Sequence, residues 1–387
     1  MPFAALAAIS PYGANLTVNA SGDFDMSSTK LANESYLGGI DLIVGGDLNV
    51  GGQFTTFGDP GAPKGIFTTS GGNISVLANG DVNVNGSRIA AYNGGDVTIE
   101  SLNGNLTAGN GGSGYVSMNA LELDPLTGQL VSLPASIPGS GILATTLPGS
   151  HAQLGNILVE TPRGNISASL GGVLQLSFNG TDASKAVTML LAGYELRDAA
   201  GVNRLSAANL SADYQLVKQL GSDAPPFAFN LVNASGATIG KLPVISLARN
   251  IDASGSGVIA QNLVAKATRE VGGIFISAGA SDISGKQIGP IVLIGNGPIT
   301  VGGDSVGPQR IIGSTDPVIN GVENPVEPTA AAAPASVAQT ATDAKEISKQ
   351  AEGEFGDEED KKKEGGGKGI VLAQKTGRVT VILPAKN

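Results

Sequence analysis

A five-residue motif recurs along this chain: glycine, then Asp or Asn, then apolar, polar and apolar or small residues. It occupies Gly72–Val76, Gly80–Val84, Gly95–Ile99 and Gly104–Ala108. The first and third copies begin 23 residues apart and the second and fourth begin 24 apart, so the copies come in pairs. A repeat of this length with two short strands per unit is typical of a solenoid, in which each turn of chain stacks on the previous one.

Similar motifs return in the second half of the chain. Gly155 and Gly164 open another pair, 9 residues apart. Further copies are expected at Arg249–Ile251, Gly272–Ile274 and Gly297–Ile299, spaced by 23 and 25 residues, with Ser281–Ile283 beginning 9 residues after Gly272. This recurrence predicts that the solenoid continues over most of the chain.

The alternation within each motif explains why such units would stack. Val82–Val84 places apolar side chains on one face of a strand and a polar one on the other, so a single strand cannot bury its apolar face alone. Gly-Asp and Asn-Gly also mark two-residue hairpin turns, which leaves an antiparallel sandwich as the alternative. The unequal spacing of the motifs favours the solenoid. The predicted fold is all-β, a parallel β-helix with coils of about 23 residues.

The composition limits the classes of function. The 387 residues include 57 Gly and no Cys or Trp, and only 4% are aromatic, which suits a narrow interior of small aliphatic side chains. A net charge of −10 argues against a nucleic-acid partner. No apolar run approaches the roughly 18–20 residues that span a bilayer, so no transmembrane segment is expected.

Six segments follow from the pattern. They are irregular entry strands at 1–37, solenoid at 38–115, a proline-rich loop excursion at 116–153, solenoid at 154–313 with an insertion near 181–226, a low-complexity linker at 314–368 and a terminal hairpin at 369–387. Ala183–Leu191 could form either a buried strand or a helix, because periodicity does not distinguish them.

Four stretches carry a resemblance to a known family: Gly80–Ile89, Gly94–Ile99, Asn103–Gly111 and Asn250–Ala260. The sequence resembles the carboxy-terminal region of the filamentous haemagglutinin family of large bacterial surface proteins. The resemblance implies a right-handed β-helix, exported as part of a longer chain by an outer-membrane two-partner secretion transporter. It also implies display or release as an adhesin at the surface of a Gram-negative bacterium. Two features depart from the family: the amino-terminal secretion domain is not recognisable, and Pro384–Asn387 lacks the final aromatic residue of outer-membrane barrels.

Few residues suggest catalysis or metal binding. Asp81 and Asp96 could stack as a carboxylate pair of a glycoside hydrolase, but their position directly after glycine is better explained by a turn. His151 is the only histidine and is expected to be an incidental surface residue. Gly94–Asp96 and Gly302–Asp304 are fragments of a calcium-binding turn without its period. We therefore predict no catalytic, metal-binding or cofactor-binding residues and no cofactor, and the pattern identifies no ligand-binding residue.

Three functions remain open. The first is a non-enzymatic adhesive rod that contacts host cells, neighbouring cells or a matrix glycan. The second is a β-helical polysaccharide lyase or hydrolase, and the third is an inert stalk. A cross-coil row of carboxylates or basic residues in a groove would favour the enzyme, and the sequence pattern reveals none.

Overall fold

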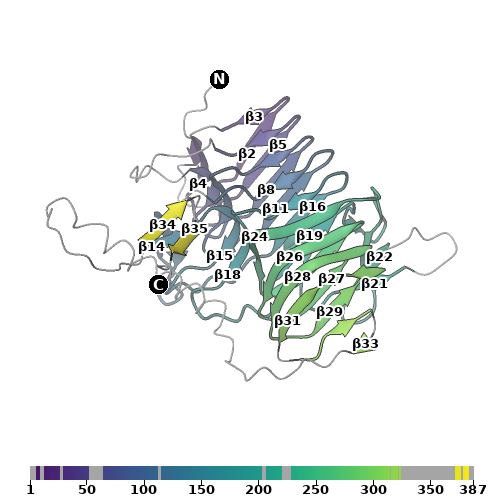
Figure 1. The fold of residues 1–387 in the computed structure, drawn as a ribbon. Coiled ribbons are helices and arrows are strands. Elements are labelled where there is room, and N and C mark those ends of the chain that lie inside the picture. Colours follow the sequence, from purple (N-terminus) through teal and green to yellow (C-terminus); the bar gives the residue numbers. More distant parts are fainter. Residues whose placement is uncertain are drawn as a thin grey trace, which may run out of the picture.

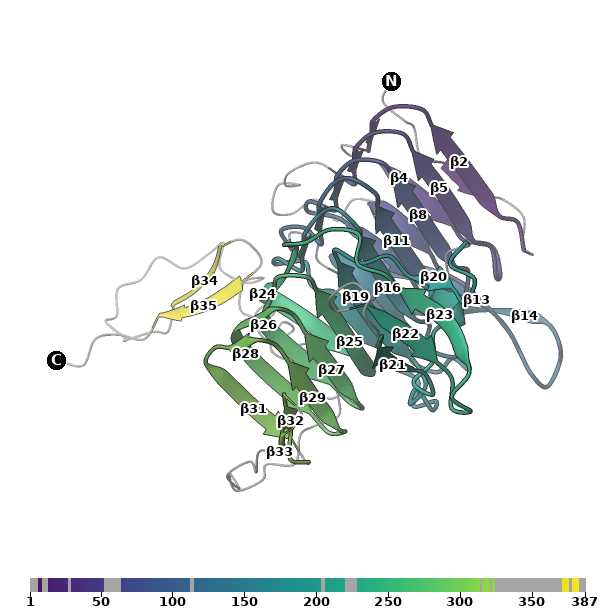
Figure 2. The same cartoon turned by 90° about the vertical axis from the view of Figure 1, so that its right-hand side faces the viewer.

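In the computed structural model, the secondary structure of the described residues is almost entirely β-strand, with one 3₁₀ turn at Ala207–Asn209. The structure describes residues 6–8, 13–26, 29–51, 64–111, 115–202, 206–219, 228–313, 315–320, 322–323, 371–375 and 378–382. Parallel strands from successive coils lie side by side in two long sheets, which Figures 1 and 2 show as a stack running from the N-terminal to the C-terminal coils. The prediction of a parallel β-helix is confirmed.

Each coil carries three strand positions, and stacked coils turn these into three columns. Column 1 holds two-residue strands: β3 (Phe24–Asp25), β6 (Leu48–Asn49), β9 (Val82–Asn83), β12 (Leu106–Thr107) and β17 (Ile166–Ser167). Column 2 holds β1 (Leu6–Ala8), β4 (Lys30–Asn33), β7 (Gly65–Thr68), β10 (Arg88–Ala91), β15 (Gly141–Thr145) and β18 (Val173–Leu176). The motifs beginning at Gly80 and Gly104 precede column 1.

Column 3 forms the second sheet. Its members are β2 (Leu16–Ala20), β5 (Ile40–Val44), β8 (Ile74–Ala78), β11 (Val97–Ser101), β16 (Ile157–Thr161), β19 (Val187–Ala192), β25 (Asn262–Ala267), β27 (Ser281–Ser284), β29 (Ile299–Gly302) and β32 (Val318–Ile319), with β33 (Val322–Glu323) antiparallel to the last. The motifs beginning at Gly72 and Gly95 precede this column. The sequence pattern gave two strands per coil and missed column 2.

The hydrophobic core lies inside the coils. In β5 the exposure alternates strictly, so that Ile40, Leu42 and Val44 point inward and are at most 2% exposed. Parallel pairing sets Leu42 beside Val76, and Val76 beside Ile99, so equivalent side chains stack along the axis. Each buried aliphatic side chain contributes about 1.5–3 kcal/mol relative to an exposed one.

The coils shorten toward the C-terminal end. Leu16 pairs with Ile40 and Ile74 with Val97, which gives coils of 24 and 23 residues. Later, Leu263 pairs with Ser281, which gives a coil of only 18 residues, and the next coil is as long. The reason is that columns 1 and 2 merge into single strands: β24 (Asn250–Ala260), β26 (Glu270–Ser277) and β28 (Gln287–Gly295), before β30 (Ser305–Val306) and β31 (Gln309–Gly313) separate again.

The spacing expected for the C-terminal motifs is therefore wrong. Ile251 pairs with Val271, Ile274 with Val292 and Ile299 with Ser281, so the three motifs do not occupy equivalent positions in successive coils.

A first insertion lies between columns 1 and 2 of one coil. Within the segment 116–153, expected to be a loop excursion, the structure has a hairpin of β13 (Tyr115–Leu123) and β14 (Leu130–Pro138), followed by the regular coil strand β15. Its inner side chains, among them Ala120 and Leu133, pack with Phe67 and Tyr92 on the outer face of column 2.

A second insertion covers column 3. Its four-stranded antiparallel sheet contains β20 (Arg197–Asp198), β21 (Gln215–Lys218), β22 (Phe229–Val232) and β23 (Thr238–Leu242). Figure 2 shows this sheet against β16 and β19, and its Leu231 and Leu242 share a core cluster with Met189 and Leu191. Ala183–Leu191 therefore ends in a strand, β19, that is buried on both faces. The insertion lies between β19 and β24, so it overlaps the expected 181–226 but begins after residue 192 and extends to 249.

A buried ion pair adds to the contact between this insertion and the coils. Lys266 on β25 forms a salt bridge with Asp282 on β27, and its ammonium lies 5.0 Å from the ring centre of Phe229 on β22. Only 3% of the Lys266 side chain is exposed. Burial lowers the pKa of Lys266, and the neighbouring Asp282 carboxylate acts in the opposite direction.

The two ends of the chain differ from the middle. Residues 1–37 were expected to form irregular strands, but β2, β3 and β4 already pair in register with the next coil. At the other end β34 (Val371–Lys375) and β35 (Arg378–Ile382) form an antiparallel hairpin within the segment 369–387. Most of the predicted linker, from 324 onward, lies outside the described residues.

Part of column 3 is covered by the second insertion and part is exposed. Comparing one residue from each part tests whether the insertion packs on the column. Ile43 and Leu191 occupy the same outward row, but Ile43 is 42% exposed and Leu191 is buried under the inserted sheet. We expect Leu191→Ala to lower the free energy of unfolding by about 2–5 kcal/mol, because it leaves a cavity. Ile43→Ala should change it by less than about 0.5 kcal/mol. Guanidinium denaturation followed by circular dichroism measures both, and equal effects would contradict the described cover.

Candidate functional site

An open polar groove with a volume of about 590 Å³ crosses the outside of the β-helix, where column 1 turns toward column 2. It spans the four coils that contain β9, β12, β17 and β24. The lining residues are Asn85, Thr107, Gly109, Asn110, Ser167, Ser169, Leu170, Asp252, Ser254 and Gly255. All but Leu170 are polar residues or glycine, which sets this groove apart from the apolar interior.

Column 1 positions the polar side chains. In each of its two-residue strands the first side chain points into the core and the second points outward, as Val82 and Asn83 do. Parallel pairing puts the outward residues in register, so that Thr107 lies beside Asn83 on one side and Ser167 on the other. The complete row is Asp25, Asn49, Asn83, Thr107, Ser167 and Asp252. Neighbouring strands are about 4.8 Å apart, so the row presents one polar group at each such step.

Three hydroxyl groups form a connected cluster in the groove. The Ser169 Oγ lies 2.7 Å from the Ser167 Oγ and 3.1 Å from the Thr107 Oγ1. Ser169 and Asn85 both have left-handed backbone conformations, with φ of 47° and 56°. These corner conformations fix the direction of the two side chains, so the polar groups are already arranged before any ligand arrives.

Asn110 leaves one hydrogen-bond acceptor unused. Its Oδ1 is buried and has no hydrogen-bond partner among the residues that the structure describes. Buried polar atoms in folded proteins are nearly always paired, with protein, water or a ligand. Asn110 lines the groove, but this oxygen is itself shielded from it.

Asp252 is the only ionisable side chain among the lining residues. Its Oδ1 accepts a hydrogen bond of 2.8 Å from the Ser254 backbone N–H. Glycoside hydrolases need two carboxyl groups flanking the bond that they cleave. The groove as described offers one, so its chemistry suits hydrogen bonding to a ligand better than acid–base catalysis.

The structure does not bring Asp81 and Asp96 together as a pair. Asp81 precedes column 1, where its Oδ1 accepts a hydrogen bond of 2.7 Å from the Asn105 N–H in the next coil. Asp96 precedes column 3, where its Oδ1 accepts one of 2.7 Å from the Asn156 N–H. Each belongs to a separate row of corner residues, which we call a corner ladder. In such a ladder the side-chain oxygen of one coil accepts a hydrogen bond from a backbone N–H of the next coil.

The column 1 ladder is the longer one. It runs through Asp23, Asp47, Asp81, Asn105, Asn165 and Asn250, with hydrogen-bond lengths of 2.7–3.0 Å. Asp and Asn both present the accepting oxygen, which explains why either residue follows the glycine in the sequence motif. Asp96, in the other ladder, has a raised pKa because burial penalises its charge, although the hydrogen bonds from Asn156 act in the opposite direction.

His151 has a more specific role than an incidental surface residue. The buried Glu122 of β13 accepts a hydrogen bond of 2.5 Å from the His151 N–H, and the same Oε1 lies 2.8 Å from the His151 Nδ1. The imidazole itself is 70% exposed. The pair fastens the loop after β15 to the first insertion, and the sequence gives no signal for it because the two residues are 29 positions apart.

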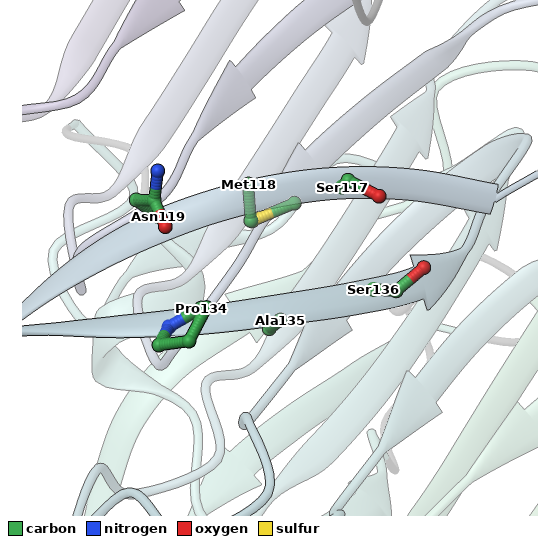
Figure 3. A pocket seen from close by; sticks show the side chains of 6 residues that line it. All are labelled: Ser117, Met118, Asn119, Pro134, Ala135 and Ser136. Carbon is green, nitrogen blue, oxygen red and sulfur yellow. The ribbon is translucent and has the colours of Figure 1, made fainter. Parts of the chain in front are cut away.

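A second hollow of about 400 Å³ lies on the β13–β14 hairpin. Figure 3 shows its lining on the two strands, with Ser117, Met118 and Asn119 on β13 facing Pro134, Ala135 and Ser136 on β14. It contains no ionisable side chain, and it does not extend across the coils. We regard the longer polar groove as the better candidate site.

No group of three or more His, Asp or Glu residues in the described part of the chain could hold a metal ion. In the proposed calcium-turn fragment Gly94–Asp96, the Asp96 carboxylate already caps Asn156. The acidic run at 357–360 lies outside the described residues.

Comparison with known proteins does not assign the chain to a family. No family model, curated protein or solved structure matches the chain. The relationship to the filamentous haemagglutinin family therefore stays a prediction. No helix in the described ranges is both long enough and apolar enough to cross a membrane.

The burial of Asp96 predicts a pH-dependent stability effect. Its raised pKa in the folded state means that folding disfavours the charged form, and this cost is fully present once the pH exceeds the folded pKa. Asp96→Asn keeps the oxygen that caps Asn156 and removes the charge. We expect the variant to unfold at higher denaturant concentration than the wild type at pH 7, and the gain to disappear below pH 3.8, the ordinary aspartate pKa.

Asp81→Asn is the matched control for this experiment, because it makes the same change in the other ladder. It therefore controls for the loss of one side-chain charge and for the change of the capping group. Urea denaturation at both pH values measures the effect, and a loss of stability in Asp96→Asn at pH 7 would contradict the stated cost of burial.

Proposed function

We propose that this chain is a non-enzymatic segment of a bacterial surface or secreted adhesin, a rigid β-helical rod that attaches to cells or matrix through its outer polar surface. The observation that carries the proposal is the polar groove across four coils, in which hydroxyl and amide groups are held ready without contributing to the apolar core.

The stacked architecture supports a projecting role. Column 3 holds ten strands, β2 to β32, so the stack is about 45 Å long at about 4.8 Å per strand. Every coil is hydrogen-bonded to its neighbours, and such a stack resists bending. A rod of this kind can hold a binding surface away from the surface that bears it.

The position of the insertions supports a surface role for column 1. The hairpin packs on column 2 and the inserted sheet packs on column 3. The outward residues of column 1 stay half-buried or exposed. Three members of the row, Thr107, Ser167 and Asp252, line the groove and can meet a partner there.

Export through an outer-membrane transporter is part of the proposal and comes from the resemblance. A solenoid suits such a route, because each coil contacts only its neighbours and can fold as it emerges. The chain also contains no Cys, so its folding requires no disulfide formation. The proposed location is the extracellular side of a Gram-negative bacterium.

Binding and turnover can be tested together. We expect the purified chain to bind saturably to a panel of host cells, bacterial cells or matrix preparations. Incubation with a panel of polysaccharides should generate no new reducing ends and no unsaturated sugars. Turnover of any polysaccharide would contradict the adhesin function and favour a polysaccharide lyase or hydrolase. Absence of binding to every surface would favour an inert stalk.

A further inference from the structure

We infer that the polar groove binds an extended, uncharged polysaccharide whose sugar units lie along the β-helix axis, one unit per coil. This inference rests on the proposed adhesive function and adds the binding site and the chemical class of the ligand.

The periodicity of the groove is the first argument. Thr107, Ser167 and Asp252 are in register on consecutive strands, so equivalent polar groups repeat about every 4.8 Å along the axis. This distance is comparable with the length of one pyranose unit in an extended glycan. A polymer with the same repeat can make an equivalent hydrogen bond at every coil, whereas a compact ligand would use only one or two.

The chemistry of the lining is the second argument. The hydroxyl groups of Thr107, Ser167 and Ser169 can each donate or accept, which matches the hydroxyl groups of sugars. No Lys or Arg lines the groove, and its one charged side chain is Asp252. Sulfated or uronic-acid glycans would therefore meet repulsion without a compensating cation, particularly on a chain with a net charge of −10.

The groove also fits a sugar better than a peptide or an apolar ligand. Adding a peptide strand needs a free sheet edge, and both sides of each β12 and β17 strand are already paired. An apolar ligand would find Leu170 as the only large apolar side chain in the lining.

Pre-arranged polar groups give the third argument. Ser256 Oγ donates to the Leu170 carbonyl at 2.6 Å and joins the coils of β17 and β24 at the groove. The Ser169 hydroxyl is held by those of Ser167 and Thr107, at 2.7 and 3.1 Å. Binding costs less side-chain entropy when the protein groups are already held in place.

The test is a length series of neutral oligosaccharides, from two to eight units of glucose, mannose, galactose or N-acetylglucosamine, measured by calorimetry on the whole chain. We expect the affinity to rise with each unit up to about four, the number of coils that the groove spans, and then to level off. Sulfated and uronic-acid oligosaccharides of the same length should bind at least tenfold more weakly.

Two tryptophan variants locate the site. Ser254 is exposed in the groove, and only its backbone N–H bonds to Asp252, so Ser254→Trp should fill the groove without disturbing the core. Ser75→Trp makes the same change at an exposed position on column 3. We expect the first to weaken oligosaccharide binding at least tenfold and the second to leave it unchanged.

A variant with smaller changes tests whether the loss of binding comes from the groove and not from misfolding. Thr107→Val together with Ser167→Ala removes two hydroxyl groups with little change in shape and should also weaken binding. Thermal melts of all variants should match the wild type. The inference is overturned if affinity does not depend on length, if anionic glycans bind better, or if Ser254→Trp binds like Ser75→Trp.

The same materials separate this inference from the adhesive function. If the wild type and Ser254→Trp attach equally well to cells, the groove is not the adhesive site, and the proposed adhesive function is retained. If the wild type attaches to no cell or matrix and binds no oligosaccharide, both fail. If the groove binds and cleaves the glycan, the ligand class stands and the non-enzymatic function is wrong.

Discussion

The structure depends on the stacking of inward-facing apolar side chains from coil to coil. One such line runs from Val18 through Leu42, Val76, Ile99, Val159, Leu190, Ala265, Ile283 and Val301 to Ile319, each beside the next on a parallel strand. No coil can bury this surface alone, so each is stabilised by its neighbours. Because side chains alternate along a strand, the inward residues hold the fold and the outward residues are free to serve other purposes.

The corners complete the stacking with hydrogen bonds. A backbone N–H at each corner would lack a strand partner, and the side-chain oxygen of an Asp or Asn in the preceding coil accepts it, as Asp81 does for Asn105. The residues that first suggested a carboxylate pair are thus part of the framework. The outward residues Thr107, Ser167 and Asp252 of column 1 belong to the groove instead of this framework, which is why the groove is the candidate site.

The outer faces of the coils divide into covered and uncovered regions, and this division decides what each outward residue does. Leu191 and Ile43 occupy the same row of column 3, yet one is in a core under the inserted sheet and the other faces solvent. Lys266 is an outward residue that the insertion buries, and it needs Asp282 as its partner there. The described parts of the two insertions pack on columns 2 and 3, and Thr107, Ser167 and Asp252 of column 1 line the groove.

The sequence by itself determined that the chain forms stacked parallel coils, because the alternation within Gly80–Val84 and the return of the motif are local properties. It also placed six strands correctly, β8, β9, β11, β12, β16 and β17, since each of them directly follows a Gly-Asp or Gly-Asn corner. Only the tertiary structure decided how coils of different lengths align: Val97 pairs with Ile157 across the first insertion because the extra residues leave at a corner and the register resumes afterwards. It likewise shortened the last coils and gathered Thr107, Ser169 and Asp252 into one groove. Those outcomes depend on packing between segments far apart in the sequence, which a local pattern does not encode.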